Sequence, residues 1–203
     1  MFAQPQQQEL SAPVDYPRPH LRRSNVLREI IETILLIAIV YTLVNLATVR
    51  FYIEGPSMEP NFYRNQFLIV SRLNYLFGEP ARGDVVVFDP PGDDTPEPLL
   101  IKRLIGLPGE TVEIRDTQVY INGTLLDEPY TNEPCNITRC PNREWVLGEN
   151  EYFFMGDNRN NSRDSRVFGV VTRDRIIGEA VVRYWPIQDV AIFSGYRYSS
   201  SSE

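Results

Sequence analysis

The run Ile30-Ile31-Glu32-Thr33-Ile34-Leu35-Leu36-Ile37-Ala38-Ile39-Val40-Tyr41-Thr42-Leu43-Val44-Asn45-Leu46-Ala47-Thr48-Val49 divides the 203-residue chain into two unequal parts. A helix of this length reaches about 30 Å, which is the thickness of the hydrocarbon core of a bilayer. Glu32 lies near the start of the run, where a carboxylate still reaches the interface. We therefore expect one transmembrane helix over residues 29–49.

Basic residues are concentrated before this run. Arg18, Arg22, Arg23 and Arg28 precede it, and only Arg50 follows it closely. This asymmetry predicts a cytoplasmic N-terminus and an extracytoplasmic domain after the span. A cleaved signal peptide is the alternative, but the run is unusually long for one and no small-x-small cleavage site follows it.

The two flanking parts differ in composition. Residues 1–28 are rich in Gln, Pro and Arg and nearly free of large apolar side chains, which predicts a disordered cytoplasmic tail. Residues 50–203 hold 16 basic and 23 acidic residues. An acidic extracytoplasmic domain argues against nucleic acid as a partner. We expect a folded domain over residues 50–190 and a C-terminal tail over residues 191–203.

After the span the pattern changes to short β-branched and aromatic stretches separated by Pro- and Gly-containing loops, which predicts strands. These strands are expected at residues 66–71, 84–88, 99–105, 111–114, 151–155 and 180–185. Asn122-Gly123, between two apolar stretches, predicts a two-residue hairpin turn. The expected fold is mainly β: an antiparallel sheet with a small second lobe, preceded by one transmembrane helix.

Cys135 and Cys140 are the only cysteines. An extracytoplasmic compartment is oxidising, so we expect a local disulfide between them. Two thiols without histidine are too few for a structural zinc site. No metal or organic cofactor is expected.

The single lysine, Lys102, lies in the apolar segment Leu99-Leu100-Ile101-Lys102-Arg103-Leu104-Ile105-Gly106. An ammonium among apolar neighbours loses hydration, so its pKa falls and it becomes a usable base. A lysine on a strand edge with its head in water is the alternative. The only histidine, His20, precedes the span, so a serine nucleophile in the exterior domain has Lys102 as its candidate base.

Two loops carry the remaining candidate groups. In Glu54-Gly55-Pro56-Ser57-Met58-Glu59-Pro60, two prolines restrict the backbone around Ser57. Ser57 follows Val49 by eight residues, a reach of at most about 28 Å, so we expect it close to the membrane surface.

The second loop is Gly156-Asp157-Asn158-Arg159-Asn160-Asn161-Ser162-Arg163-Asp164-Ser165-Arg166. An exposed turn or a calcium loop would share its density of short polar side chains. Calcium fits poorly, because Arg159 occupies the third position and no glycine occupies the sixth. A buried network of Asp164 with Arg166 or Arg103, with Ser162 directed towards the lysine, fits the pattern better.

Four segments in chain order resemble the motifs of type I signal peptidases, and the resemblance extends from the span to about Pro186. They are Gly55-Pro56-Ser57-Met58-Glu59-Pro60, Arg82-Gly83-Asp84-Val85-Val86, Lys102-Arg103-Leu104-Ile105-Gly106-Leu107-Pro108-Gly109-Glu110 and the loop 156–166. The resemblance implies a serine endopeptidase that removes N-terminal signal peptides from exported preproteins. It further implies substrates with small residues at the first and third positions before the cut.

The resemblance also implies a role for each matching residue. Ser57 would be the nucleophile, Lys102 the general base and Ser162 the hydroxyl that orients the amine. The apolar residues expected to line the substrate pockets are Phe51, Ile53, Met58, Phe62, Leu100 and Ile101. The residues expected to support the catalytic loop are Arg103, Asp157, Arg159, Asp164 and Arg166.

Two residues depart from the family pattern. Gly55 stands where some members have a serine, so no side-chain hydroxyl there helps to stabilise the oxyanion, and Asn61 stands where a threonine is usual.

We expect a monomer in a bacterial cell membrane, or in a thylakoid membrane if one is present. The alternatives are a self-cleaving Ser/Lys regulator and a non-catalytic membrane-anchored β-domain that binds partners.

Overall fold

The computed structural model describes residues 25–92 and 97–198, which belong to two compact units, one ending at Tyr41 and the other beginning at Thr42. Most of the expected N-terminal tail, residues 1–24, lies outside the described residues. Helix α1 covers Asn25–Ala47. Within it, Val26–Ala47 is long and apolar enough to cross a membrane.

The bounds of α1 differ from the expected span. The helix begins at Asn25, inside the segment assigned to the tail, and it ends at Ala47, before the expected end at Val49. Thr48 and Val49 instead open strand β1 (Thr48–Tyr52), whose backbone pairs in an antiparallel ladder with β2. Strand pairing therefore overrides the apolar pattern at the end of the run.

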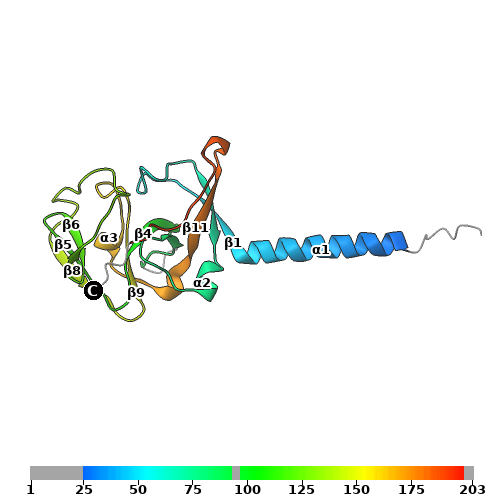
Figure 1. The fold of residues 1–203 in the computed structure, drawn as a ribbon, viewed down its shortest axis with the longest axis horizontal. Coiled ribbons are helices and arrows are strands. Elements are labelled where there is room, and N and C mark those ends of the chain that lie inside the picture. The colour runs from blue at the N-terminus through cyan, green and yellow to red at the C-terminus, as the bar shows by residue number, and fades with distance from the viewer. Residues whose placement is uncertain (1–24, 93–96, 199–203) are drawn as a thin grey trace, which may run out of the picture. The chain divides into compact units, whose positions relative to one another are not determined.

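The second unit is mainly antiparallel β, which confirms the predicted fold class (Figure 1). Its larger sheet has eight strands in the order β1-β2-β11-β3-β4-β9-β10, with β12 paired to β11. Besides β1, these strands are β2 (Phe67–Ser71), β3 (Val85–Phe88), β4 (Leu100–Gly106), β9 (Glu151–Met155), β10 (Val171–Thr172), β11 (Ile176–Trp185) and β12 (Ala191–Ile192).

A four-stranded sheet in the order β7-β6-β5-β8 forms the small second lobe. Its strands are β5 (Thr111–Arg115), β6 (Gln118–Ile121), β7 (Thr124–Leu125) and β8 (Arg143–Val146). Asn122 and Gly123 connect β6 to β7 with φ angles of 49° and 79°, the conformation that the predicted hairpin turn requires. The short helical elements are α2 (Asn74–Phe77), α3 (Ser165–Phe168), η1 (Arg173–Arg175) and η2 (Ile187–Asp189).

The core explains why β3 and β4 are buried. Side chains alternate along a strand, so Val85 and Val87 enter one apolar cluster, whereas Val86 and Phe88 enter another. The Phe88 ring stacks on Phe154 with their centroids 4.4 Å apart. Every residue of β4 from Ile101 to Gly106 is buried, so its two polar side chains, Lys102 and Arg103, lie away from solvent.

The six predicted strands correspond to β2, β3, β4, β5, β9 and the second half of β11. Strands β1, β8, β10 and β12 were not predicted. Strand β1 begins inside the apolar run assigned to the span, β8 has one half-buried residue and three exposed ones, and β10 and β12 have only two residues each. The expected tail at residues 191–203 is wrong in its first part. Ala191–Ile192 form β12, which pairs with β11, and residues 193–198 pack on the domain.

Candidate active site

Two segments 45 residues apart bring Ser57 and Lys102 together. Ser57 lies in the loop between β1 and β2, and Lys102 lies on β4. Lys102 Nζ is 2.8 Å from Ser57 Oγ, and it donates a second hydrogen bond to the Ile101 carbonyl at 2.7 Å. The amine thus contacts a hydroxyl directly, which is the geometry that proton transfer between the two requires.

Burial sets the protonation state of this amine. The Lys102 residue is only 3% exposed. Desolvation lowers the pKa of Lys102 to about 8, against the opposing effect of the carboxylates of Asp164 and Asp157. At that pKa about a tenth of the amine is neutral at pH 7, far more than for an exposed lysine. Lys102 is therefore a buried amine with a lowered pKa, as expected, and not a surface lysine whose ammonium lies in water.

The Ser57 loop is tied to the loop that follows β9. The Ser57 carbonyl accepts a hydrogen bond from the Asn158 backbone N–H at 3.0 Å. The Asn158 side-chain amide donates to the Pro56 carbonyl at 3.2 Å. The position of the nucleophile therefore depends on the position of loop 156–164.

Arg103, next to Lys102 on β4, holds this loop through Asp157. Its Nε and Nη2 donate to the two carboxylate oxygens of Asp157, both at 2.7 Å, and its Nη1 donates to the Gly83 carbonyl at 2.8 Å. The Asn61 amide adds a bond to Asp157 at 2.8 Å. Two consecutive residues of β4 thus have different partners: Lys102 contacts Ser57, with which it forms the pair called the dyad below, and Arg103 holds Asp157 in the loop beside it.

Asp164 ties the far end of the loop back to its beginning. It accepts hydrogen bonds from Arg166 Nε and Nη2 at 2.8 and 2.7 Å and from the Gly156 N–H at 2.9 Å. Burial favours the protonated form of Asp164, but its bonds to Arg166 outweigh burial, and the pKa of this carboxyl is lowered. Asp164 therefore stays ionised, as the predicted network requires.

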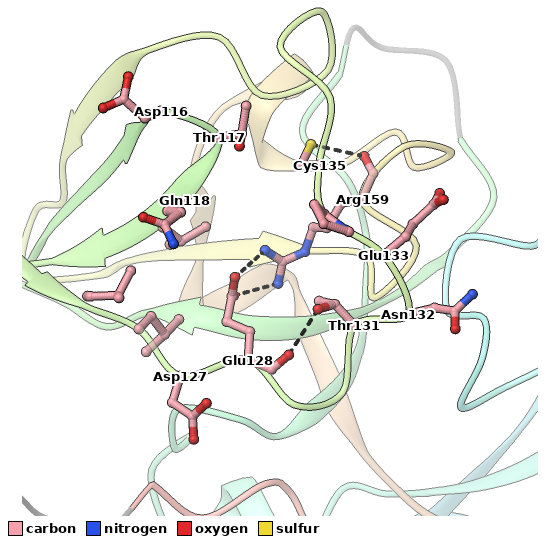
Figure 2. Close-up of a pocket in the computed structure, with 14 residues that line it drawn as sticks. Asp116, Thr117, Gln118, Asp127, Glu128, Thr131, Asn132, Glu133, Cys135 and Arg159 are labelled. Carbon is pink, nitrogen blue, oxygen red and sulfur yellow. Dashed lines mark hydrogen bonds and ion pairs between the residues drawn. The ribbon is translucent and has the colours of Figure 1, made fainter.

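Arg159 anchors the loop to the small lobe. Its guanidinium donates to both carboxylate oxygens of Glu128, at 2.7 and 2.9 Å, and its Nε donates to the Gly156 carbonyl at 2.9 Å. The pair lies beside a cavity of about 650 Å³ (Figure 2). This cavity is larger than the groove at the dyad, but neither Ser57 nor Lys102 lines it.

The expected hydrogen bond between Ser162 and Lys102 is not formed in this structure. Ser162 Oγ is buried and forms no hydrogen bond of good geometry among the described residues, although its side chain is near enough to Asp164 to help lower the pKa of that carboxyl. Gly156 separates Ser162 from the nucleophile: a Cβ at position 156 would lie 2.3 Å from Ser162 Oγ and 2.5 Å from the Ser57 carbonyl oxygen. Only glycine allows these two serines to approach each other so closely.

An apolar groove of about 310 Å³ leads to the dyad. Four of the six predicted pocket residues line it: Phe51, Ile53, Leu100 and Ile101. Met58 and Phe62 do not line this groove; they belong to the same core cluster as Ile53 and Ile101, and their place in a substrate pocket stays a prediction. Tyr52, Pro98 and Leu99 also line the groove and were not predicted, although each adjoins a predicted residue.

Other residues were missed by the sequence analysis. Asn61, noted only as a departure from the family pattern, donates to the Tyr130 carbonyl at 2.7 Å as well as to Asp157. Glu128 and Tyr130 lie in a loop without a recognisable motif.

Cys135 and Cys140 form a disulfide with their Cα atoms 6.0 Å apart. Within the described ranges, no group of three or more His, Cys, Asp or Glu side chains is arranged to hold a metal ion.

A buried lysine against a serine hydroxyl at the end of an apolar groove is the arrangement of a serine peptidase that uses lysine in place of histidine. The family described as signal peptidase, peptidase S26, matches residues 27–185, and the chain belongs to this family. The resemblance drawn from the four motifs is thereby confirmed.

Individual relatives agree with the family match. The chain is 38% identical to the probable signal peptidase I-2 of Synechocystis sp. over 146 residues, which cover 70% of this chain and 66% of that protein. It is 30% identical to signal peptidase IB of Staphylococcus aureus over 195 residues, which cover 87% of this chain and 97% of that protein. A crystal structure of a signal peptidase I from Enterococcus faecalis is 35% identical, with a TM-score of 0.43 over 51% of this chain and 98% of that one.

Proposed function

We propose that this protein is a serine endopeptidase that cleaves N-terminal signal peptides from exported preproteins, with Ser57 as nucleophile and Lys102 as general base. One observation carries the proposal: the buried Lys102 amine lies 2.8 Å from Ser57 Oγ, and both residues line the same groove. Family membership supplies the substrate class.

The reaction divides into acylation and deacylation. The neutral Lys102 amine takes the Ser57 proton as Oγ attacks the scissile carbonyl carbon. The peptide C–N bond then breaks, and the ammonium returns the proton to the leaving amine. A water molecule, deprotonated by Lys102, attacks the acyl-enzyme and releases the signal peptide with a free carboxylate.

The backbone N–H of Ser57 is the donor that we assign to the oxyanion. It has no protein acceptor among residues 25–92 and 97–198, so it is available to a substrate. Gly55 contributes no hydroxyl. A fixed backbone donor in a groove from which the bound substrate displaces water stabilises the developing charge more than it would in bulk solvent.

Ser162 is assigned the role of orienting the lysine amine. Its buried hydroxyl forms no hydrogen bond of good geometry in the described structure, and Gly156 brings it close to the residue that bears the nucleophile. An ammonium has three donors; Ser57 Oγ and the Ile101 carbonyl accept two of them, and we assign the third to Ser162 Oγ.

The arginines on the N-terminal side of the apolar run support a cytoplasmic N-terminus and a peptidase domain on the outer side of the membrane. Substrate and enzyme then share one membrane surface, which raises their effective concentration. We propose that the enzyme acts as a monomer, in a bacterial cell membrane or a thylakoid membrane.

Purified full-length protein should cut a preprotein at the signal peptide junction, and the new N-terminus identifies the bond. Changing the residue before the cut from Ala to Phe should lower the cleavage rate about a hundredfold or more, because the groove of about 310 Å³ is already lined by Phe51, Leu100 and Ile101. An Ala-to-Ser substrate is the matched control. Equal cleavage of the Phe and Ala substrates at the same bond would contradict the specificity.

Activity should rise with pH through about 8, the pKa to which burial lowers Lys102. The sign follows from the mechanism: the base is the neutral amine, and its fraction increases as the ammonium loses its proton. The dependence of kcat/KM on pH between 6 and 10 reports the pKa of the base in the free enzyme. A rate that continues to rise tenfold per pH unit up to pH 10 would show an unperturbed amine.

A further inference from the structure

Residues 193–198 close over the peptidase domain after β12. The Tyr196 N–H donates to the Gly83 carbonyl at 3.1 Å. Gly83 has a φ of +94°, and a Cβ there would lie 2.0 Å from the Tyr196 carbonyl oxygen. Phe193 packs on Phe62 with their ring centroids 4.7 Å apart. Glycine at position 83 is therefore needed for the segment to approach.

Tyr198 connects this segment to Tyr130. Its hydroxyl lies 2.7 Å from the hydroxyl of Tyr130, a residue that is only 7% exposed. The Tyr198 ring is held edge-on against Tyr196, with their centroids 4.8 Å apart. Burial raises the pKa of both Tyr130 and Tyr198, so this pair stays neutral and hydrogen-bonded across the working pH range.

Tyr130 in turn contacts both groups that hold Asp157. The Arg103 guanidinium lies over the Tyr130 ring, 4.1 Å from its centroid. The Tyr130 carbonyl accepts from the same Asn61 amide that donates to Asp157. Arg103 and Tyr196 also share the Gly83 carbonyl as acceptor. The C-terminal segment thus reaches the Arg103–Asp157 pair by two separate routes.

We propose that residues 193–198 form a clasp that positions the catalytic loop, and that Tyr198 is a positioning residue acting through Tyr130 on the Arg103–Asp157 pair. The inference rests on the proposed function, because it deepens the account of the same site. Tyr198 touches neither the substrate groove nor the dyad.

The effect on catalysis is transmitted through few contacts. Asp157 is followed by Asn158, whose N–H holds the Ser57 carbonyl at 3.0 Å. A displaced Tyr130 would release Arg103 and Asn61 together, so Asp157 would move and the nucleophile would move with it. Small misplacements of reacting atoms lower turnover strongly.

The test compares phenol deletions in the full-length protein in detergent. Tyr198→Phe removes only the bond to Tyr130, so kcat should fall about three- to tenfold while KM stays within about twofold. Tyr120→Phe is the matched control, because it deletes an exposed phenol that bonds Gln118 at 3.3 Å in the same lobe. Its kcat should be unchanged, and Tyr198→Ala should lose more than Tyr198→Phe.

Hydrogen exchange of the amides of residues 156–164 gives a readout that does not depend on turnover. Faster exchange there in Tyr198→Phe, with the melting temperature and the exchange of β5 unchanged, is expected. An unchanged kcat with unchanged exchange would overturn the clasp, and so would a lower melting temperature without a change in kcat. If wild-type protein cut no preprotein, the proposed function would fail, and the exchange data alone would still decide whether the clasp holds the loop.

Discussion

Lys102→Arg is expected to lower kcat/KM about a thousandfold or more, as severely as Lys102→Ala. A guanidinium keeps its proton at every working pH, so it cannot accept the Ser57 proton even though it preserves the charge. The 2.8 Å contact in the native site supplies proton transfer, which charge alone does not replace. Ser57→Ala should reach the same residual rate, because dyad residues act as a unit.

The measurement is preprotein cleavage under single-turnover conditions, with the melting temperature recorded for every variant. Lys102→Met is a control for packing, since it keeps the length of the side chain in the buried strand β4 without a titratable group. Arg115→Lys, on the surface of β5, should remain fully active. Appreciable turnover by Lys102→Arg would remove lysine as the base.

The contact between Ser57 and Lys102, the pair that we propose as catalytic, was predictable from the sequence because rare residues limited the choices. A single lysine in an apolar strand and a single histidine before the span leave one candidate base for the exterior domain. Strands with strong β-branched content, such as β3 and β4, were also predictable. Their burial on both faces then sets the low pKa of Lys102 that the mechanism needs.

Contacts between distant segments were not predictable in the same way. Tyr130 and Glu128 acquire their roles only because the chain folds back onto Arg103 and Arg159. Ile53, Met58 and Phe62 share one core cluster, but only Ile53 also lines the groove, and nothing in the sequence separates an apolar residue of the core from one that also lines a groove. The docking of residues 193–198 depends on space above Gly83, which no local pattern encodes.

Asp157→Ala is expected to destabilise the domain by about 3–5 kcal/mol, because it leaves the buried Arg103 guanidinium without its partner. The two side chains are 6% and 0% exposed, so solvent cannot replace the lost carboxylate. The midpoint of urea unfolding, followed by the fluorescence of the two tryptophans, Trp145 and Trp185, measures the change. Glu97→Ala breaks the more exposed pair with Arg163 and should leave the midpoint nearly unchanged, whereas an equal effect of both variants would deny the Arg103–Asp157 pair a special role.

A double variant separates the stabilising role of this pair from its role in catalysis. Arg103→Met with Asp157→Leu replaces two buried charges by apolar side chains, so most of the lost stability should return. Turnover should stay at least about a hundredfold low, because leucine accepts no hydrogen bond from Asn61 and the loop that holds Ser57 loses its fixed position. Recovery of cleavage together with stability would show that the pair only stabilises the fold. Stable but slow protein would show that the ion pair is retained for the geometry it imposes on the nucleophile.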